Sequence, residues 1–286
     1  LLLEDLAASM VGGDDAPAPV STGIDLIDGV FREEEAREGS KTGLVGGDLG
    51  VVAARPGEGK TALAEVLSLN IARQGFGAAI CSLDMGMKQL RGRLLSKMAH
   101  DPLNPGRGPS VKLLADRSLM TGLSDVRQGM VRTAATELAK LPLNATRIPR
   151  PGIREIRSYA RRLAHRLQRE GTQLDCTVLL LVQINRSAEL NPGGKPEERN
   201  LKESGDIEQA ADWIWLLWRQ GKRDKMKPKD EITLIVAKNR RGEPGVEVTL
   251  SWHGPSGTIA DPPWRDVHGG EVHNLNAIRT NQGWRD

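Results

Sequence analysis

The feature that most constrains this chain is the stretch ARPGEGKT at residues 54–61, which stands between a strand pattern and a helix pattern. LGVVAA indicates a buried strand that runs into it, and KTALAEVLSLNIARQG indicates a helix that ends at Gly75. A glycine-rich turn into a helix N-terminus presents backbone N–H groups and a partial positive charge to anions. The stretch fits the phosphate-loop pattern, except that Ala54 replaces the first glycine. We therefore predict that the chain binds a nucleotide.

The residues of this loop have separate roles in nucleotide binding. Gly57 and Gly59 let backbone N–H groups turn toward the phosphates. Lys60 can reach the β- and γ-phosphates, and the Thr61 hydroxyl can hold Mg²⁺, so ATP and Mg²⁺ are the expected cofactors. The predicted nucleotide-binding residues are Gly57, Glu58, Gly59, Lys60, Thr61 and Ala62. The alternative, a glycine turn that contains Lys-Thr by chance, is disfavoured by the strand before it and the helix after it.

Strands and helices alternate after the loop. Helices are expected in the 86–100 and 124–140 regions and, with a clear apolar stripe, at 153–171. Strands are expected at residues 77–85, 177–182, 212–218, 232–237 and 246–252, and KNRRGEPG joins the last two as a hairpin. The predicted fold class is α/β, with a mostly parallel sheet flanked by helices and an antiparallel hairpin near the C-terminus.

One junction, GTQLDCTVLLLVQINR at residues 171–186, is too short for such a fold. In phosphate-loop ATPases a strand that ends in Asp helps to hold Mg²⁺, and a helix leads from it to the next strand. A parallel crossover needs at least about 10–12 residues. Asp175 is the only acid nearby, and it follows one Leu rather than an apolar strand. We therefore expect residues to be missing between Asp175 and Val178; the alternative is a natural deletion and a chain that does not hydrolyse ATP.

Amino-acid composition excludes only a few classes of protein. Lys and Arg number 40 against 37 Asp and Glu, and a net charge of +3 argues neither for nor against nucleic acid. Cys81 and Cys176 are too few for a disulfide framework or a zinc site. The longest apolar runs are strand-sized, so no membrane span is expected. The chain starts at Leu1 and shows no signal peptide, so we expect a cytoplasmic protein and the visible part of a longer one.

Several motifs then occur in one order. They are STGIDLIDG, GDLGVVAARPGEGKTALA, AAICSLDMGMKQLRGRLLS, LPLNATRIPRPGIREIRSYARRL, LLLVQINRSAE, NLKESGDIEQAADWIWLLWR and LIVAKNRRGEPGVEVTLSW. Together, over about residues 21–252, they closely resemble the C-terminal motor domain of DnaB-type replicative helicases. The resemblance implies a RecA-like core in a six-membered ring of identical subunits around single-stranded DNA, with ATP between neighbours. The implied activity is ATP-driven unwinding of duplex DNA at replication forks, in a bacterial cell or a phage-infected host, with a primase or a helicase loader as a partner.

The resemblance also implies roles for catalytic residues. Asp84 stands where the family has the catalytic Glu, one methylene longer, and Arg93 matches an arginine near the γ-phosphate. Gln183 matches the γ-phosphate sensor. Lys238 and Arg240 match the pair that reaches the neighbour's ATP, with Arg240 as the finger. The alternatives are a helix N-cap for Asp84 and an ordinary surface arginine for Arg93.

The remaining implied contacts are with DNA. Lys202, Glu203 and Gly205 stand in the pore loop, where the family contacts the DNA backbone, although the family usually has Arg at the Lys202 position. The basic loop at 219–229 adds to this surface or is an exposed solubilising loop. Two rival functions stay open: a RecA-like recombinase-type ATPase, and a ring that binds DNA as a scaffold without hydrolysis.

The same resemblance divides the chain. Residues 1–20 are expected to be a linker helix and a linker, 21–253 the RecA-like motor domain, and 254–286 an irregular tail.

Overall fold

The computed structural model describes residues 18–31, 42–100, 108–115, 123–148, 176–184, 191, 194–197, 205–222, 224 and 226–262. The helix expected at residues 153–171 and the first 17 residues of the expected linker helix and linker lie outside these ranges. Nothing in the described part of the chain is a helix long and apolar enough to cross a membrane.

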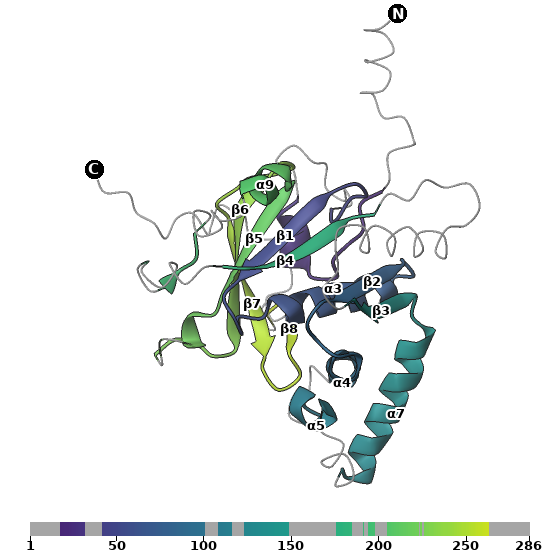
Figure 1. Cartoon of the computed structure of the whole chain (residues 1–286). Coiled ribbons are helices and arrows are strands. Elements are labelled where there is room, and N and C mark those ends of the chain that lie inside the picture. Colours follow the sequence, from purple (N-terminus) through teal and green to yellow (C-terminus); the bar gives the residue numbers. More distant parts are fainter. Residues whose placement is uncertain are drawn as a thin grey trace, which may run out of the picture.

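A six-stranded sheet lies at the centre of the described structure (Figure 1), with the strand order β4-β1-β5-β6-β7-β8. Its strands confirm the expected ones closely and add one at the end. They are β1 (Leu49–Ala54), β4 (Val178–Gln183), β5 (Trp213–Trp218), β6 (Glu231–Asn239), β7 (Glu247–His253) and β8 (Thr258–Ala260).

The expectation of a mostly parallel sheet holds only in part. β4 and β5 flank β1 and run parallel to it, whereas β6, β7 and β8 join antiparallel. Among the described residues, the connections after β5 contain no helix long enough for a crossover, only the short 3-10 helix η4 (Gln220–Lys222) and turns. Short connections allow only antiparallel neighbours, so the sheet is mixed.

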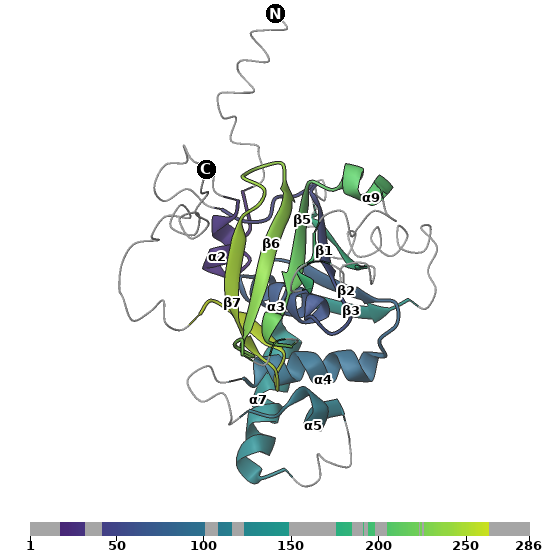
Figure 2. The same ribbon diagram turned by 90° about the vertical axis from the view of Figure 1, so that its left-hand side faces the viewer.

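Two strands form a separate parallel sheet, β2 (Ala78–Ser82) with β3 (Leu143–Arg147). Between them the chain forms α4 (Met87–Met98), α5 (Val111–Ala115) and α7 (Asp125–Lys140). In both views these helices gather on the side of the small sheet that faces away from the central sheet (Figures 1 and 2). β3 was not expected, because LNATR has no apolar run or strict alternation.

One helix connects the two sheets. α3 (Lys60–Arg73) contacts β1 and β4 of the central sheet and also β2 and β3 of the small one. Its Leu63, Val66 and Leu67 belong to the main hydrophobic core of the central sheet. Leu69, one turn away, packs with Leu90 in a separate hydrophobic cluster beside the small sheet. The helix therefore covers both sheets as it would cover one continuous sheet.

Two short helices complete the described elements. α2 (Asp25–Gly29) contacts β7 at the far side of the hairpin, as Figure 2 shows, and α9 (Gly205–Ala210) leads into β5. The tail expected to be irregular from residue 254 is not so at its start, since β8 pairs with β7 there. Only three residues form β8, too few for a sequence pattern to reveal it.

Candidate nucleotide-binding site

The phosphate loop follows β1 and opens into α3. Gly57 has φ 76° and Gly59 has φ 104°, both in the left-handed region that glycine adopts without strain. A Cβ on Gly59 would also lie 3.1 Å from Ile232 Cδ1, closer than an ordinary contact, so Ile232 would have to shift. The loop backbone at the helix N-terminus therefore has the conformation that a phosphate cradle requires.

Glu58 ties this loop to the end of β5. Its side chain is buried, and Oε2 accepts a hydrogen bond from the backbone N–H of Arg219 at 2.8 Å. The Arg219 guanidinium in turn lies over the Trp252 ring, 4.5 Å from its centroid. Burial lowers the pKa of Arg219, while the charge of Glu58 opposes that shift. Glu58 thus fixes the loop from behind rather than facing solvent.

A second cation lies on the loop itself. Lys222, in η4, donates a hydrogen bond from Nζ to the carbonyl of Pro56 at 3.0 Å. The same nitrogen would be 2.7 Å from a Cβ on Gly57. Part of the basic loop at 219–229 therefore contacts the phosphate loop, a position that neither reading of that loop anticipated.

Lys60 and Asp84 lie near enough to interact electrostatically at the start of α3. Burial lowers the pKa of Lys60 below its ordinary value of 10.5, and the negative charge of Asp84 acts in the opposite direction. Asp84 is solvent-exposed in the turn after β2, where it can meet a substrate. The charge of the predicted carboxylate thus acts on the predicted phosphate-binding lysine, although 24 positions separate them in the sequence.

The N-cap alternative for Asp84 is wrong. α4 begins at Met87 with Gly86 as its N-cap, and no side chain bonds to the helix end. The Ser82 side chain holds the turn instead: its hydroxyl accepts the N–H of Met85 at 3.0 Å and donates to the Met85 carbonyl at 3.1 Å. The Asp84 carboxylate is left for another purpose.

Arg93 lies on α4 but points toward α3. Its Nε donates to Glu65 Oε1 at 2.5 Å, and Lys97 Nζ donates to Glu65 Oε2 at 2.5 Å. The Glu65 and Lys97 side chains are only 1% and 2% exposed, and burial lowers the pKa of Lys97 despite the adjacent carboxylate. Arg93, at 21%, is the accessible member of this cluster, so it is not an ordinary surface arginine.

Gln183 ends β4 directly beside the phosphate loop. The parallel register sets it opposite Ala54, the last residue of β1. Because parallel strands end at one edge of the sheet, Gln183 and the loop share that edge. Thr61 and Ala62 follow Lys60 in the first turn of α3, with Ala62 buried.

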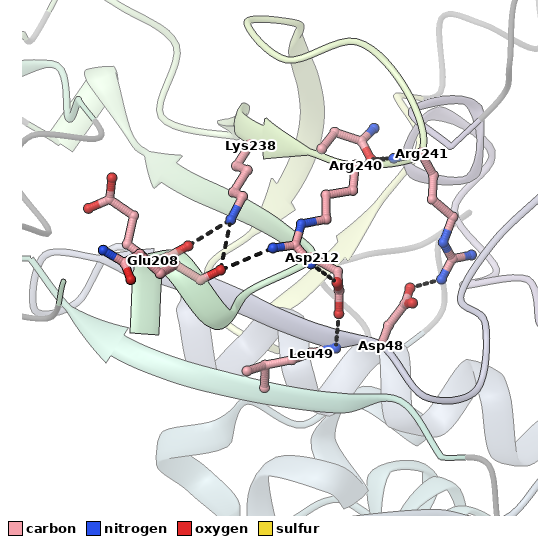
Figure 3. A network of polar contacts seen from close by, with 9 residues as sticks. Asp48, Leu49, Glu208, Asp212, Lys238, Arg240 and Arg241 are labelled. Atoms are coloured by element: carbon pink, nitrogen blue, oxygen red, sulfur yellow. Dashed lines mark hydrogen bonds and ion pairs between the residues drawn. The ribbon is translucent and has the colours of Figure 1, made fainter. Parts of the chain in front are cut away.

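Lys238 and Arg240 lie at the end of β6 and both hold the C-terminus of α9 (Figure 3). Lys238 Nζ donates to the Glu208 carbonyl at 2.7 Å, and Arg240 Nη2 donates to the Gln209 carbonyl at 3.1 Å. Arg240 Nη1 also pairs with Asp212 Oδ1 at 2.9 Å. These cations satisfy carbonyls that a helix end leaves without intrahelical partners.

The predicted DNA-contacting residues are only partly described. Lys202 and Glu203 lie outside the described residues, and Gly205 is the first residue of α9. Lys238 and Arg240 thus bind the same short helix, α9, into which the predicted pore loop leads. This connection was not visible in the sequence, because Lys238 and Glu208 are 30 positions apart.

Thr61, the predicted ligand for Mg²⁺, lies in the first turn of α3, directly after Lys60. Within the described ranges, however, no group of three or more His, Cys, Asp or Glu side chains could hold a metal ion.

Comparison with protein families identifies the architecture. The model of the DnaB-like helicase C-terminal domain matches residues 37–171 and 164–260. Replicative DNA helicase DnaB of Leifsonia xyli subsp. xyli is 31% identical over 254 residues, covering 77% of this chain and 53% of that protein. DnaB of Treponema pallidum is 29% identical over 266 residues, covering 78% and 56%. Replicative DNA helicase DnaC of Bacillus subtilis is 29% identical over 235 residues, covering 69% and 49%. The chain spans about half the length of these curated relatives.

Solved structures show the same fold. One solved ATPase domain superposes with a TM-score of 0.73 at 21% identity, covering 91% of this chain and 97% of that one. A DnaB-like replicative helicase, solved in a study of its interactions with primase, gives a TM-score of 0.74 at 21% identity, covering 91% and 67%.

Proposed function

Since the chain belongs to the DnaB-like helicase C-terminal domain family, we propose that it is the motor of an ATP-driven ring helicase that moves along single-stranded DNA. In this proposal it unwinds duplex DNA at replication forks as a homo-hexamer in the cytoplasm, with a primase or a loader as partner. The observation that carries the proposal is the site itself. The phosphate loop has its glycines in the left-handed conformation and its Lys60 within the electrostatic reach of Asp84, while the Lys238 and Arg240 pair lies on a separate element beside α9.

Phosphoryl transfer needs positioning and charge neutralisation more than covalent help. Lys60 binds the β- and γ-phosphates, with the backbone N–H groups of Gly57 and Gly59. Asp84 orients the attacking water, and Gln183 at the end of β4 senses the γ-phosphate. Thr61 is the chain's own ligand for Mg²⁺, which when bound neutralises phosphate charge. Arg93 approaches the γ-phosphate only if it leaves Glu65, its partner here.

Lys238 and Arg240 act on the neighbouring subunit's ATP. In the single chain both are engaged at the end of α9, so reaching a neighbour's phosphates means exchanging carbonyl partners for phosphate oxygens. Phosphate is the stronger acceptor for a cation, because the hydrogen bond is then charge-assisted on both sides. The exchange would loosen the helix that follows the pore loop, and so connects hydrolysis with the DNA contact.

The DNA contact is proposed at Lys202, Glu203 and Gly205. Binding through the backbone phosphates is independent of sequence and weakens with salt. Lys at position 202 supplies a point charge rather than the two-pronged contact of an arginine.

The test is ATP binding and hydrolysis by Lys60→Ala, with Lys88→Ala as a matched control, since Lys88 is an exposed lysine of α4 outside the loop. The proposal expects Lys60→Ala to lose hydrolysis and Lys88→Ala to keep it. Equal hydrolysis in the two variants would remove the phosphate loop from the mechanism. Strand exchange without unwinding would favour the recombinase-type alternative. A complete ring that binds DNA but does not hydrolyse ATP would favour the scaffold alternative.

A further inference from the structure

Two packed helices meet at a cluster of three charged side chains, Glu65 of α3 and Arg93 and Lys97 of α4. The two cations donate to different oxygens of the same carboxylate, Arg93 Nε to Oε1 and Lys97 Nζ to Oε2 of Glu65. The Glu65 and Lys97 side chains are almost completely buried. Charged side chains are rarely buried unless they are paired, and an apolar contact would join two helices without them. The pair therefore needs an explanation other than packing.

The cluster contains one cation more than the carboxylate requires. Glu65 carries one negative charge, whereas Arg93 and Lys97 together carry two positive charges. Burial lowers the pKa of Lys97, the adjacent charge of Glu65 raises it, and the charge of Arg93 lowers it again, so the two cations disfavour each other. If Arg93 leaves, Glu65 and Lys97 remain as a neutral pair. Arg93 is thus the cation that the cluster can release.

The surroundings of Lys97 show that it is the fixed partner. Its Nζ would lie 3.3 Å from a Cβ on Gly257, in the turn between β7 and β8. The same Cβ position lies 4.0 Å from Cβ of Ala62, in the first turn of α3. α3, α4 and the turn therefore enclose the Lys97 ammonium group, whereas the Arg93 side chain is 21% exposed.

The cluster lies one helical turn from the phosphate loop. Thr61 and Glu65 are four positions apart on α3, so their side chains are neighbours on one face, with Cβ atoms about 5–6 Å apart. Side chains on a helix also point toward its N-terminus, where the phosphate loop opens into α3. Arg93 bound at Glu65 is therefore about one turn, ~5.4 Å, from the first turn of α3. A long arginine side chain can cross that distance by changing rotamers.

We propose that Glu65 and Lys97 are positioning residues for Arg93: Glu65 holds Arg93 one turn below the phosphate loop in the nucleotide-free subunit, and Lys97 allows its release by keeping the buried carboxylate paired. Removing one partner from a buried ion pair is strongly unfavourable, because the other charge is left without compensation. Lys97 prevents that outcome, so Arg93 exchanges the carboxylate for the γ-phosphate of ATP and returns when the γ-phosphate is gone. The inference rests on the proposed role of Arg93 at the γ-phosphate.

The test is the ratio of two affinities, for AMP-PNP, an ATP analogue that is not hydrolysed, and for ADP. Calorimetric titration of the full chain with each nucleotide and Mg²⁺ gives this ratio, which reports the γ-phosphate contact. Lys97→Met should lower the ratio at least ~10-fold with ADP affinity unchanged, because Arg93 must then leave a buried carboxylate unpaired. The double variant Glu65→Leu/Lys97→Met should restore the ratio, because no carboxylate holds Arg93.

Lys140→Met is the matched control. Lys140 also pairs with a glutamate, Glu137, but both side chains are solvent-exposed. The ratio should not change in this variant. An unchanged ratio in Lys97→Met, a fall that the double variant does not reverse, or an equal loss of affinity for both nucleotides would overturn the inference.

Glu65→Gln gives a second reading that does not depend on whether Lys97→Met folds. It keeps the shape of the side chain but removes the charge that holds Arg93, so the ratio should rise at least ~3-fold, because a hydrogen bond to a neutral acceptor is weaker. An unchanged or lower ratio in folded Glu65→Gln would contradict the inference. The proposed function fails differently: the unmodified chain would then bind neither nucleotide, whereas binding of both with a ratio that ignores these substitutions removes the inference alone.

Discussion

Arg240 and Asp212 form an ion pair, with 2.9 Å between Nη1 and Oδ1. The other carboxylate oxygen of Asp212 accepts the backbone N–H of Leu49 at 2.8 Å, at the start of β1 (Figure 3). The arginine proposed to act on a neighbour's nucleotide is thus held, in its own subunit, by the residue that anchors the strand leading to the phosphate loop. In the proposed ring, this contact links the finger arginine of one subunit to that subunit's own nucleotide site.

Arg240→Ala should reduce hydrolysis at least ~100-fold while changing the free energy of unfolding by less than about 1 kcal/mol. The first expectation follows from the size of arginine-finger effects. The second follows because the Arg240 side chain is 54% exposed, and exposed ion pairs contribute little. ATPase assays and urea denaturation measure the two quantities. Arg241→Ala is the control, since Arg241 is the next residue and also pairs with an acid, Asp48.

Mixing tests whether Arg240 acts between subunits. Rings assembled from Arg240→Ala and Lys60→Ala subunits contain some interfaces in which both wild-type residues meet, so part of the activity should return. If subunits exchange and no mixture recovers hydrolysis, Arg240 acts within its own chain.

Asp84→Glu should raise turnover, because it restores the carboxylate reach that relatives of this family use. The motivation is that Asp84 is the residue whose charge acts on Lys60. Asp84→Asn, which keeps the shape without the charge, should lower turnover. The measurement is the steady-state rate of ATP hydrolysis at saturating ATP, and a large loss in Asp84→Glu would show that the site is built around the shorter side chain.

Lys222→Ala should weaken ATP binding by about 3–10-fold, with the loss shrinking at high salt, because an exposed cation is screened. Lys222 is expected to act because its ammonium group lies on the phosphate loop, at the Pro56 carbonyl. Lys227→Ala is the matched control from the same basic segment, and titration with a fluorescent ATP analogue gives both affinities. Equal affinities would make Lys222 a structural contact only.

The hairpin β7–β8 should lose stability as pH falls below the ordinary His253 pKa of 6.5. Burial lowers the pKa of His253, so in this range the unfolded chain takes up a proton that the folded chain does not. The His253 ring also stacks on His100 with centroids 4.5 Å apart, and its Nδ1 lies 2.7 Å from the Ser256 hydroxyl. Between pH 7 and pH 5, the Tm should decrease less in His253→Gln than in the unmodified chain. Equal decreases in Tm would assign the loss of stability to other groups.

Local patterns predicted the elements around the phosphate loop well. β1 was expected at LGVVAA and lies there, and α3 begins at Lys60 as expected. The strand is predicted by its apolar run and the helix start by the glycine turn, and both signals are local to a few residues. β3 and α9 were not predicted, because elements of five or six residues with mixed composition show no clear hydrophobic periodicity.

The contacts between distant segments could not be predicted. Arg219 reaches Glu58 across 161 positions, and Arg93 turns toward Glu65 only because α4 packs on α3. Such pairs depend on how the elements dock, which a single sequence does not specify.

The most direct test of the account is ATP hydrolysis with and without single-stranded DNA, compared between the unmodified chain and its Lys60→Ala variant. The account predicts that the unmodified chain hydrolyses ATP, that single-stranded DNA raises the rate, and that Lys60→Ala removes it. An assembled ring that binds ATP and single-stranded DNA but hydrolyses ATP no faster than its Lys60→Ala form would contradict the account.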